Sequence, residues 1–333
     1  MLLLLCELGG CAAPPVAAGP QAAGRAGVDR AVSLPWWRDA GDPLLSRLVD
    51  HGLQTDPRLR RDAQSLEHAR ARSRQHGLRQ WAARLLGYTP PDLGASAQQL
   101  ADARQRKAAS IARAYVRVRR LQAALRLRED FQRHFRNDSD IAHWRREAGI
   151  VTGVDTGLAA TLLGISASAL AGTHTRLGIA TDTLARRSGV PPQRLRRDVD
   201  DGAGPPQLVV PAASSAASRD AHTRPRIARE RAALAQATAR AAALQQLETD
   251  AMRTVADART AYHLGTGDFA TLYVAETAAL RVRLARVAAR ADAADAAIGL
   301  LSAEALAMKR ASLPAPTPNR GATQPAPRNC SGD

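Results

Sequence analysis

The stretch LRVRLARVAARADAADAAIGLL, from Leu280 to Leu301, decides the fold class. Its apolar residues alternate at intervals of four and three positions without a break: Leu280, Leu284, Val287, Ala291, Ala294, Ile298 and Leu301. Such a heptad pattern predicts one long α-helix that lies nearly parallel to a partner helix. A second apolar stripe predicts another long helix and consists of Ile111, Tyr115, Val118, Leu121 and Leu125. The chain is therefore expected to be mainly α-helical.

An internal repeat relates the two halves of the chain. The segment PRLRR, which begins at Pro57, matches PRIAR, which begins at Pro225, at an offset of 168 residues. Asp56 precedes the first segment and Thr223 lies just ahead of the second. Asp and Thr side chains cap the free N–H groups of a helix, and proline fits the first helical turn. Both halves are therefore expected to open with the same kind of helix.

Two glycine-containing breaks interrupt the expected long helices. The first is AGIVTGVD, residues 148–155, and the second is LGTGDF, residues 264–269. Glycine permits the left-handed backbone that ends a helix, and Thr152, Asp155 or Asp268 can cap the helix that follows. Each break is therefore expected to form the tip of an antiparallel helical hairpin. Neither sequence has the GxxxxGK[ST] pattern of a phosphate loop.

The charge of the chain leaves two classes of function open. The formal net charge is +16, and it comes from arginine because Lys107 and Lys309 are the only lysines. Basic proteins are attracted to nucleic acid and to anionic membranes, so an arginine-rich helical nucleic-acid-binding protein is one alternative. The arginines are spread along nearly every expected helix, and no helix-turn-helix or zinc-finger pattern is present, which argues against this alternative. No apolar run reaches the ~18 residues of a membrane-spanning helix.

The N-terminus has features of a bacterial lipoprotein signal. Leucine fills half of MLLLLCELGG, and Cys11 follows the small residues Gly9 and Gly10. In such signals the cysteine is cleaved to the N-terminus and carries fatty acids such as palmitate, which would anchor the chain to a membrane. No positive charge precedes the leucines and Glu7 interrupts them, which a true start codon further upstream would explain.

No residue pattern indicates catalysis, a metal site or a cofactor. The eight histidines are isolated from one another and the three cysteines lie near the two ends of the chain. The only tight acidic cluster is Asp198, Asp200 and Asp201, and it is expected in a solvated loop bounded by Gly and Pro. We therefore expect a protein that is not an enzyme and binds no cofactor.

Several weak motifs, in this order, resemble the NodT-type branch of the TolC-like outer-membrane efflux lipoproteins. The opening Leu34-Pro35-Trp36-Trp37, followed by Gly41-Asp42-Pro43-Leu44, is similar to the family's tryptophan pair and "DP-L" turn. The segment from Ala112 to Arg119 resembles its "A-x-x-Y-x-x-L-R" helix, and the segment from Leu184 to Pro192 resembles its "LA-G-PP" signature. The resemblance spans residues 34 to 305.

This resemblance implies a homotrimer in the outer membrane, facing the periplasm and anchored through the acylated Cys11. Two hairpins from each subunit would build a periplasmic helical tunnel that solutes cross passively. The hairpin tips would contact a periplasmic adaptor (membrane fusion) protein, which serves an inner-membrane pump. By position, these contacts would fall on Gly149, Ile150, Val151, Asp155, Gly265, Thr266 and Asp268.

The sequence departs from this family in its β structure. A membrane barrel needs strands of ~9–11 residues, and the only candidates are Trp81 to Tyr88 and the short Gln207 to Pro211. The tip glycines Gly149 and Gly265 are 116 residues apart rather than 168, so the second half is 52 residues shorter than the first. We therefore expect little or no β-barrel. A barrel-less relative, a degenerate copy and a chain with missing segments are the three alternatives.

The resulting organisation has six parts. Their expected bounds are 1–11 for the lipoprotein signal, 12–35 for a flexible tether, 36–203 for the first helical half, 204–222 for a Pro/Ala/Ser linker, 223–310 for the shortened second helical half and 311–333 for a disordered tail.

Overall fold

The computed structural model of the chain describes residues 35–75, 93–200, 204–210 and 224–312. Within these ranges the secondary structure is helical, and they contain no strand. The helices are α2 (Pro43–Thr55), α3 (Pro57–Gln75), α5 (Leu93–Glu147), α6 (Gly153–Ser188), α7 (Pro192–Val199), α8 (Arg224–Leu264) and α9 (Phe269–Ser312). The expected mainly α-helical fold is confirmed.

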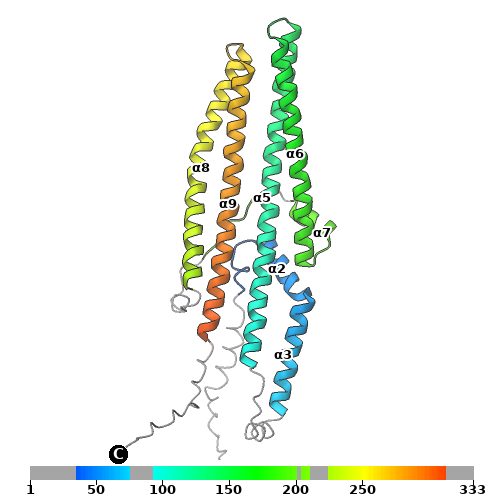
Figure 1. Ribbon diagram of the computed structural model, residues 1–333, viewed down its shortest axis with the longest axis vertical. Coiled ribbons are helices and arrows are strands. Elements are labelled where there is room, and N and C mark those ends of the chain that lie inside the picture. The colour runs from blue at the N-terminus through cyan, green and yellow to red at the C-terminus, as the bar shows by residue number, and fades with distance from the viewer. Residues whose placement is uncertain (1–34, 76–92, 201–203, 211–223, 313–333) are drawn as a thin grey trace, which may run out of the picture.

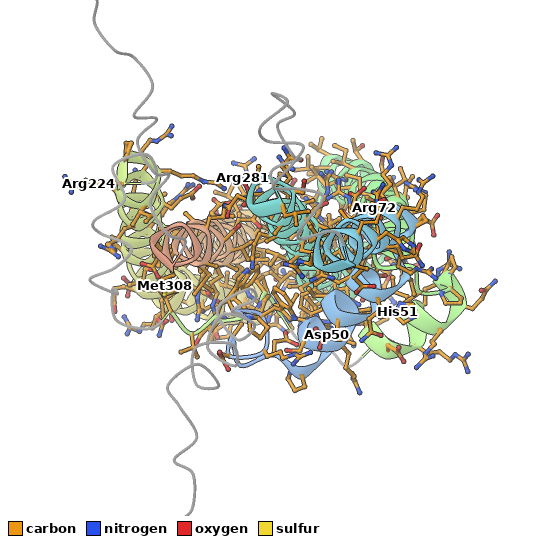
Figure 2. All side chains as sticks on the ribbon, turned by 90° about the horizontal axis from the view of Figure 1, so that it is seen from below. Asp50, His51, Arg72, Arg224, Arg281 and Met308 are labelled. Carbon is orange, nitrogen blue, oxygen red and sulfur yellow. The ribbon has the colours of Figure 1, made fainter. Side chains whose placement is uncertain are left out.

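Four long helices form two antiparallel hairpins (Figure 1). The first hairpin is α5 with α6, the second is α8 with α9, and α5 packs against α9. The four helices therefore make one layer, with α8 and α6 at its two edges. Viewed along the helices, α8 with Arg224 lies at one end of an elongated cross-section, and α2 with Asp50 and His51 lies on one side of it (Figure 2).

The main hydrophobic core lies where α2 and α7 meet this layer. Tyr115 of α5, Leu184 of α6, Leu195 of α7 and Ile298 of α9 are all buried in it. Tyr115 belongs to the predicted stripe on α5, and Ile298 belongs to the predicted heptad on α9. Both apolar patterns therefore form the buried sides of long helices, as their periodicity indicates.

A buried polar network ties α2, α5 and α7 together at this core. Arg119 is 2% exposed, and its Nε donates to the Tyr115 hydroxyl at 2.9 Å. That hydroxyl donates to Asp42 Oδ2 at 2.8 Å, while Arg119 Nη1 donates to the Val199 carbonyl at 2.9 Å. Asp42 also caps α2 by accepting from the backbone N–H groups of residues 44 and 45. One guanidinium therefore connects the start of α2 with the end of α7.

Two glycines allow α2 to cross close to the end of α6. A Cβ on Gly52 would lie 2.5 Å from Ile111 Cδ1 and 3.1 Å from the Cα of Ser188, so a larger side chain would push the helices apart. Gly189 has φ of 72°, the left-handed conformation that ends α6. At the same crossing His51 Nδ1 lies 2.8 Å from the Ser188 carbonyl oxygen.

The two halves begin alike, and the difference in their lengths arises after the first helix. Asp56 caps α3, accepting from the backbone N–H groups of Arg58 and Leu59 at 2.9 and 3.2 Å, as predicted. Leu59 in α3 and its repeat equivalent Ile227 in α8 are both buried. In the first half α3 ends at Gln75 and α5 begins at Leu93, whereas α8 runs on without a break. Thr223 and the candidate strand from Trp81 to Tyr88 lie outside the described residues.

Two local expectations are corrected by the structure. The described part of the candidate strand, residues 207–210, is not a strand, and Val209 donates one hydrogen bond to the Ala40 carbonyl at 3.3 Å. Asp198 is not in a loop but in α7, where its carboxylate lies 3.7 Å from Arg194 Nε. Arg194 and Asp198 are four residues apart, and residues with this spacing lie on the same side of a helix, where opposite charges stabilise it.

The apolar character of α6 also differs from the expectation. By length and composition α6 could cross a membrane, and only 6% of its most apolar window is buried in the chain. Small residues of this helix interrupt any run of large apolar residues, but the helix also contains few charged residues, so its mean hydropathy is high. One side of α6 is therefore apolar and solvent-exposed at the edge of the layer.

Candidate functional site

The two hairpin tips lie at the same end of the molecule (Figure 1). In the first tip Gly149 has φ of 73°, and its N–H donates to the Arg146 carbonyl at 2.9 Å. The Ile150 N–H donates to the Arg145 carbonyl at 2.8 Å. These two hydrogen bonds form a Schellman motif, which ends α5 and satisfies its last carbonyl groups.

The second tip repeats this geometry. Gly265 has φ of 80°, and its N–H donates to the Tyr262 carbonyl at 3.1 Å. The Thr266 N–H donates to the Ala261 carbonyl at 3.0 Å. Both glycines adopt the left-handed conformation that a Cβ disfavours, so the same turn chemistry closes both hairpins. The predicted role of these breaks as hairpin turns is confirmed.

The three predicted capping residues behave differently. Asp268 caps α9, since its Oδ1 accepts from the Thr271 N–H at 2.6 Å, and this hydrogen bond lowers the pKa of Asp268. Thr152 occupies the capping position of α6 but makes no side-chain hydrogen bond to its backbone. Asp155 lies in the first turn of α6, where its carboxylate accepts from the Thr152 hydroxyl at 3.4 Å. Its negative charge interacts favourably with the dipole at the N-terminus of the helix.

The outer surface of the tips is apolar as well as polar. Gly149, Gly265, Thr266 and Asp268 are exposed, while Val151 and Asp155 are half-buried. Ile150 is 69% exposed, and Val154 in the same tip and Leu264 in the second tip are also exposed. Large apolar side chains at the end of a helical hairpin are typical of a contact surface for another helical protein.

Arg145 joins the two tips. Its side chain leaves α5, and its guanidinium lies 4.3 Å from the ring centroid of Tyr262 in α8. The same guanidinium donates to the Tyr262 carbonyl and, at 3.4 Å, to the His263 carbonyl. These carbonyls belong to the last turn of α8, where a cation is electrostatically favourable.

Below the tips, a small aromatic core surrounds a buried carboxyl pair. Phe135, Tyr262, Phe269 and Leu272 form the apolar part. Next to it lie Asp138 of α5 and Glu276 of α9, which are 2% and 4% exposed. The Glu276 carboxylate accepts from Arg259 of α8. The pKa of Glu276 is raised to about 7. Burial is the main cause, and the charge of the nearby Asp138 contributes to the same rise.

Sequence reasoning found the tip turns but not the residues that join the hairpins. Arg145 resembles the many other arginines of the sequence, and no local pattern marks it. Glu276 gave a weak signal, since it is an acid on the apolar side of an otherwise hydrophobic stretch of α9. Cys11 lies outside the described residues. Within the described ranges no group of His, Cys, Asp or Glu residues is placed to hold a metal ion.

Solved structures of outer-membrane channels have a fold similar to this arrangement. No protein-family profile and no curated protein matches the sequence. The outer-membrane channel OprN superposes with a TM-score of 0.65 at 14% identity, over 83% of this chain and 93% of OprN. The outer membrane protein VceC of Vibrio cholerae gives 0.60 at 17% identity, over 82% of this chain and 98% of VceC.

CusC, whose structures describe transmembrane channel formation, gives a TM-score of 0.63 at 12% identity, over 80% of this chain and 94% of CusC. At these identities the likeness concerns the fold. It covers the part of the chain that contains the paired hairpins. The chain therefore has the helical fold of the TolC-like outer-membrane efflux channels.

Proposed function

We propose that the chain is a channel subunit of an efflux or secretion system, through which solutes move passively along a trimeric helical tunnel in the periplasm. The observation that carries this proposal is that both edges of the four-helix layer expose apolar side chains; these two surfaces are called the bare edges. On α6 Ile165 is 58% exposed, and on α8 Leu247 is 51% exposed. Buried residues are also sparse along α8, which contributes Ile227, Val255 and Tyr262 to the interior.

Two different bare edges favour a closed ring. If α6 of one subunit packs against α8 of the next, the contact is head to tail, and repeating it closes a ring when the rotation between subunits divides a full turn evenly. Each edge is rich in alanine, which lets neighbouring helices approach closely. The number of three subunits rests on the resemblance to the TolC-like family.

The tips are the proposed contact with a periplasmic adaptor. The exposed Ile150 and Leu264 would pack against helices of the adaptor, and Gly149, Gly265, Thr266 and Asp268 would shape the turns that present them. Arg145 holds the two tips together by its contacts with the end of α8. The adaptor would therefore meet one surface made by both hairpins.

An Ile165→Arg substitution should convert the assembled protein into monomers. The new charge would be buried between α6 and the neighbouring α8, and an unpaired buried charge is costly. Mass photometry of the detergent-extracted protein would show three-subunit particles for the wild type and single subunits for the variant. Circular dichroism should show the same helix content for both.

Val274→Arg is the matched control for this substitution. Val274 is 65% exposed, but it lies on α9 in the middle of the layer rather than on an edge. This variant should assemble like the wild type. A wild type that remains monomeric at all concentrations, or an Ile165→Arg variant that still assembles, would contradict the proposed ring.

Replacing Cys11 with serine should move the protein out of the outer membrane. The thiol is the proposed attachment point of the fatty acids, and two or more acyl chains give stable membrane anchoring. The full chain, with any upstream in-frame start restored, would be expressed in a Gram-negative host and fractionated on a density gradient. The wild type should be recovered with the outer membrane and the Cys11→Ser variant should not.

The same gradient distinguishes the nucleic-acid-binding alternative. Recovery of both versions in the cytosol, bound to nucleic acid and released by salt, would contradict the channel proposal. Recovery of both versions in the outer membrane would retain the channel role and remove Cys11 as the anchor.

A further inference from the structure

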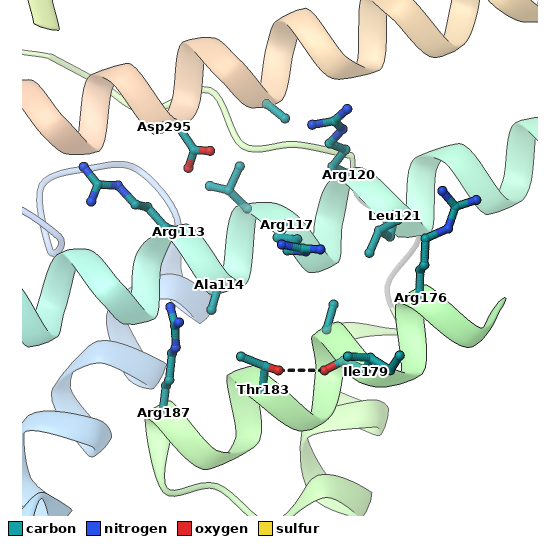
Figure 3. Close-up of a pocket in the computed structure, with 13 residues that line it drawn as sticks. Arg113, Ala114, Arg117, Arg120, Leu121, Arg176, Ile179, Thr183, Arg187 and Asp295 are labelled. Atoms are coloured by element: carbon teal, nitrogen blue, oxygen red, sulfur yellow. Dashed lines mark hydrogen bonds between the residues drawn. The ribbon is translucent and has the colours of Figure 1, made fainter. Parts of the chain in front are cut away.

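A pocket of about 610 Å³ opens between α5, α6 and α9 (Figure 3). Its charged lining comes from all three helices. The arginines are Arg113, Arg117 and Arg120 on α5, with Arg176 and Arg187 on α6. Of the described residues that line the pocket, Asp295 on α9 is the only carboxylate. Positive charge is therefore in large excess.

The pocket lies on the face of the layer that α2 and α7 leave open. Tyr115 of α5 points toward α2, since its hydroxyl donates to Asp42. Arg113 and Arg117 each lie two residues from Tyr115, which is ~200° around an α-helix. The three arginines of α5 therefore point away from the core and into the open face, where they are exposed.

The charges in the pocket are poorly balanced. Figure 3 shows Asp295 between Arg113 and Arg120, and both arginines act on its charge. Asp295 Oδ1 is nevertheless buried without a hydrogen-bond partner among the described residues. Burial is the main cause that raises the pKa of Asp295 to about 6. The only negative charge in the lining is therefore lost as the pH falls through about 6, while arginine remains charged at all ordinary pH values.

The remaining two arginines are held in place by backbone carbonyls. Arg187 Nη1 donates to the Ser110 carbonyl at 3.0 Å, and Arg176 Nε donates to the Gly172 carbonyl at 3.0 Å. Each guanidinium has five N–H donors, so both retain donors for a ligand. Between the arginines lies an apolar wall that includes Ile179, which is 62% exposed.

We infer that this pocket binds small organic anions, in which a carboxylate, sulfonate or phosphate group meets the arginines and an apolar part covers Ile179. Guanidinium groups bind such anions through paired, charge-assisted hydrogen bonds. Bringing an anion into the pocket also relieves the repulsion among the five arginines.

This inference deepens the proposed function and, for transport, rests on it. In a closed ring of helices one face of each layer lines the bore. The additional helices α2, α3 and α7 occupy one face, so the pocketed face is the one available to the bore. Five arginines from each subunit would then favour anionic solutes over cationic ones by their electrostatic potential.

The binding itself is testable without transport. Naphthalene disulfonate would be titrated into the purified full chain and followed by calorimetry. The double variant R117Q/R120Q should lose at least about tenfold in affinity, since two charge-assisted contacts are removed. Asp295→Asn should tighten binding, because it removes the competing carboxylate. Affinity should fall as salt is added.

Matched variants and probes decide between a pocket and general attraction to a basic protein. R229Q/R240Q removes two exposed arginines of α8 and should bind like the wild type. Ile179→Ser should lower the affinity for naphthalene disulfonate but leave the affinity for inorganic pyrophosphate unchanged. An aminomethyl naphthalene of the same size, which is a cation, should not bind.

Equal losses in R117Q/R120Q and R229Q/R240Q, or equal binding of the cationic probe, would overturn the inference. A wild type that does not bind the disulfonate would overturn it as well. If the protein assembles in the outer membrane but binds no anion, the channel proposal stands and the pocket inference falls. If the pocket binds anions in a protein that never assembles, the reverse holds.

Discussion

Replacing Arg119 with methionine should lower the free energy of unfolding by about 3 kcal/mol. The buried guanidinium donates to the Tyr115 hydroxyl, to the Val199 carbonyl and, at 3.3 Å, to Gln122 Oε1. Methionine fills a similar volume but leaves the Tyr115 hydroxyl and Gln122 Oε1 without this donor, whereas the Val199 carbonyl keeps the Gln122 Nε2 donor at 2.9 Å. It also removes the cation that contacts the Tyr115 ring. Urea denaturation, monitored by circular dichroism, would measure the loss.

Arg136→Met is the control for this prediction. Arg136 lies on the same helix but is exposed, so its replacement should change the free energy of unfolding by less than about 0.5 kcal/mol. An Arg119→Met variant as stable as this control would show that the buried network does not hold α2 and α7 in place.

Replacing Glu276 with glutamine should make the protein more stable than the wild type in mild alkali. Glu276 Oε2 and Asp138 Oδ2 are buried and find no hydrogen-bond donor among the described residues. Burial beside the Asp138 carboxylate favours a proton on Glu276. Glutamine has an amide N–H in place of that proton, and its carbonyl oxygen can still accept from Arg259.

The sign follows from the pKa of Glu276, which rises from an ordinary value of 4.5 to about 7 in the folded protein. The folded state holds the proton more tightly, so its stabilising effect is complete below the ordinary pKa and is lost as the pH rises through about 7. The wild type should therefore lose roughly 2 to 3 kcal/mol between about pH 5 and about pH 8 through this group. Glu276→Gln should lose none of it.

Several other titratable or charged groups line the same pocket as Glu276 or contact its neighbour Asp138. They are Asp130 and His134 on α5, Arg259 and His263 on α8, and Arg283 on α9, in addition to Asp138 itself. The measured quantity is therefore the difference in stability between variant and wild type at each pH. Asp257→Asn, at an exposed position of α8, should follow the wild type across the whole range. A Glu276→Gln variant that is less stable than the wild type at every pH would contradict a protonated Glu276 in the folded protein.

The position of this pair connects its chemistry to the tips. Asp138 belongs to the first hairpin, whereas Glu276 and Arg259 belong to the second. Arg145 joins the same two hairpins one level nearer to the tips. Ionisation of Glu276 would therefore weaken the contact between hairpins directly beneath the surface that we propose for the adaptor.

The sequence by itself determined the long helices and the turns that join them into hairpins. The heptad spacing on α9 and the stripe on α5 reflect the 3.6-residue period of a helix, and this period can be read from the local sequence alone. Gly149, Gly265, Asp56 and Asp268 act within a few residues of their own position, so their roles could be predicted locally. The sequence also supplied the ordered motifs from which the TolC-like fold was inferred.

Only the tertiary structure decided which of the many arginines matter. Arg119 is buried, Arg145 joins two hairpins, and Arg117 lines a pocket, although all three lie on the same helix. The bare apolar edge of α6 was also hidden, because small residues spread its hydrophobicity over many turns. The physical reason is common to these cases. A long-range contact depends on which helices lie side by side and at what register, and local residue patterns do not specify that arrangement.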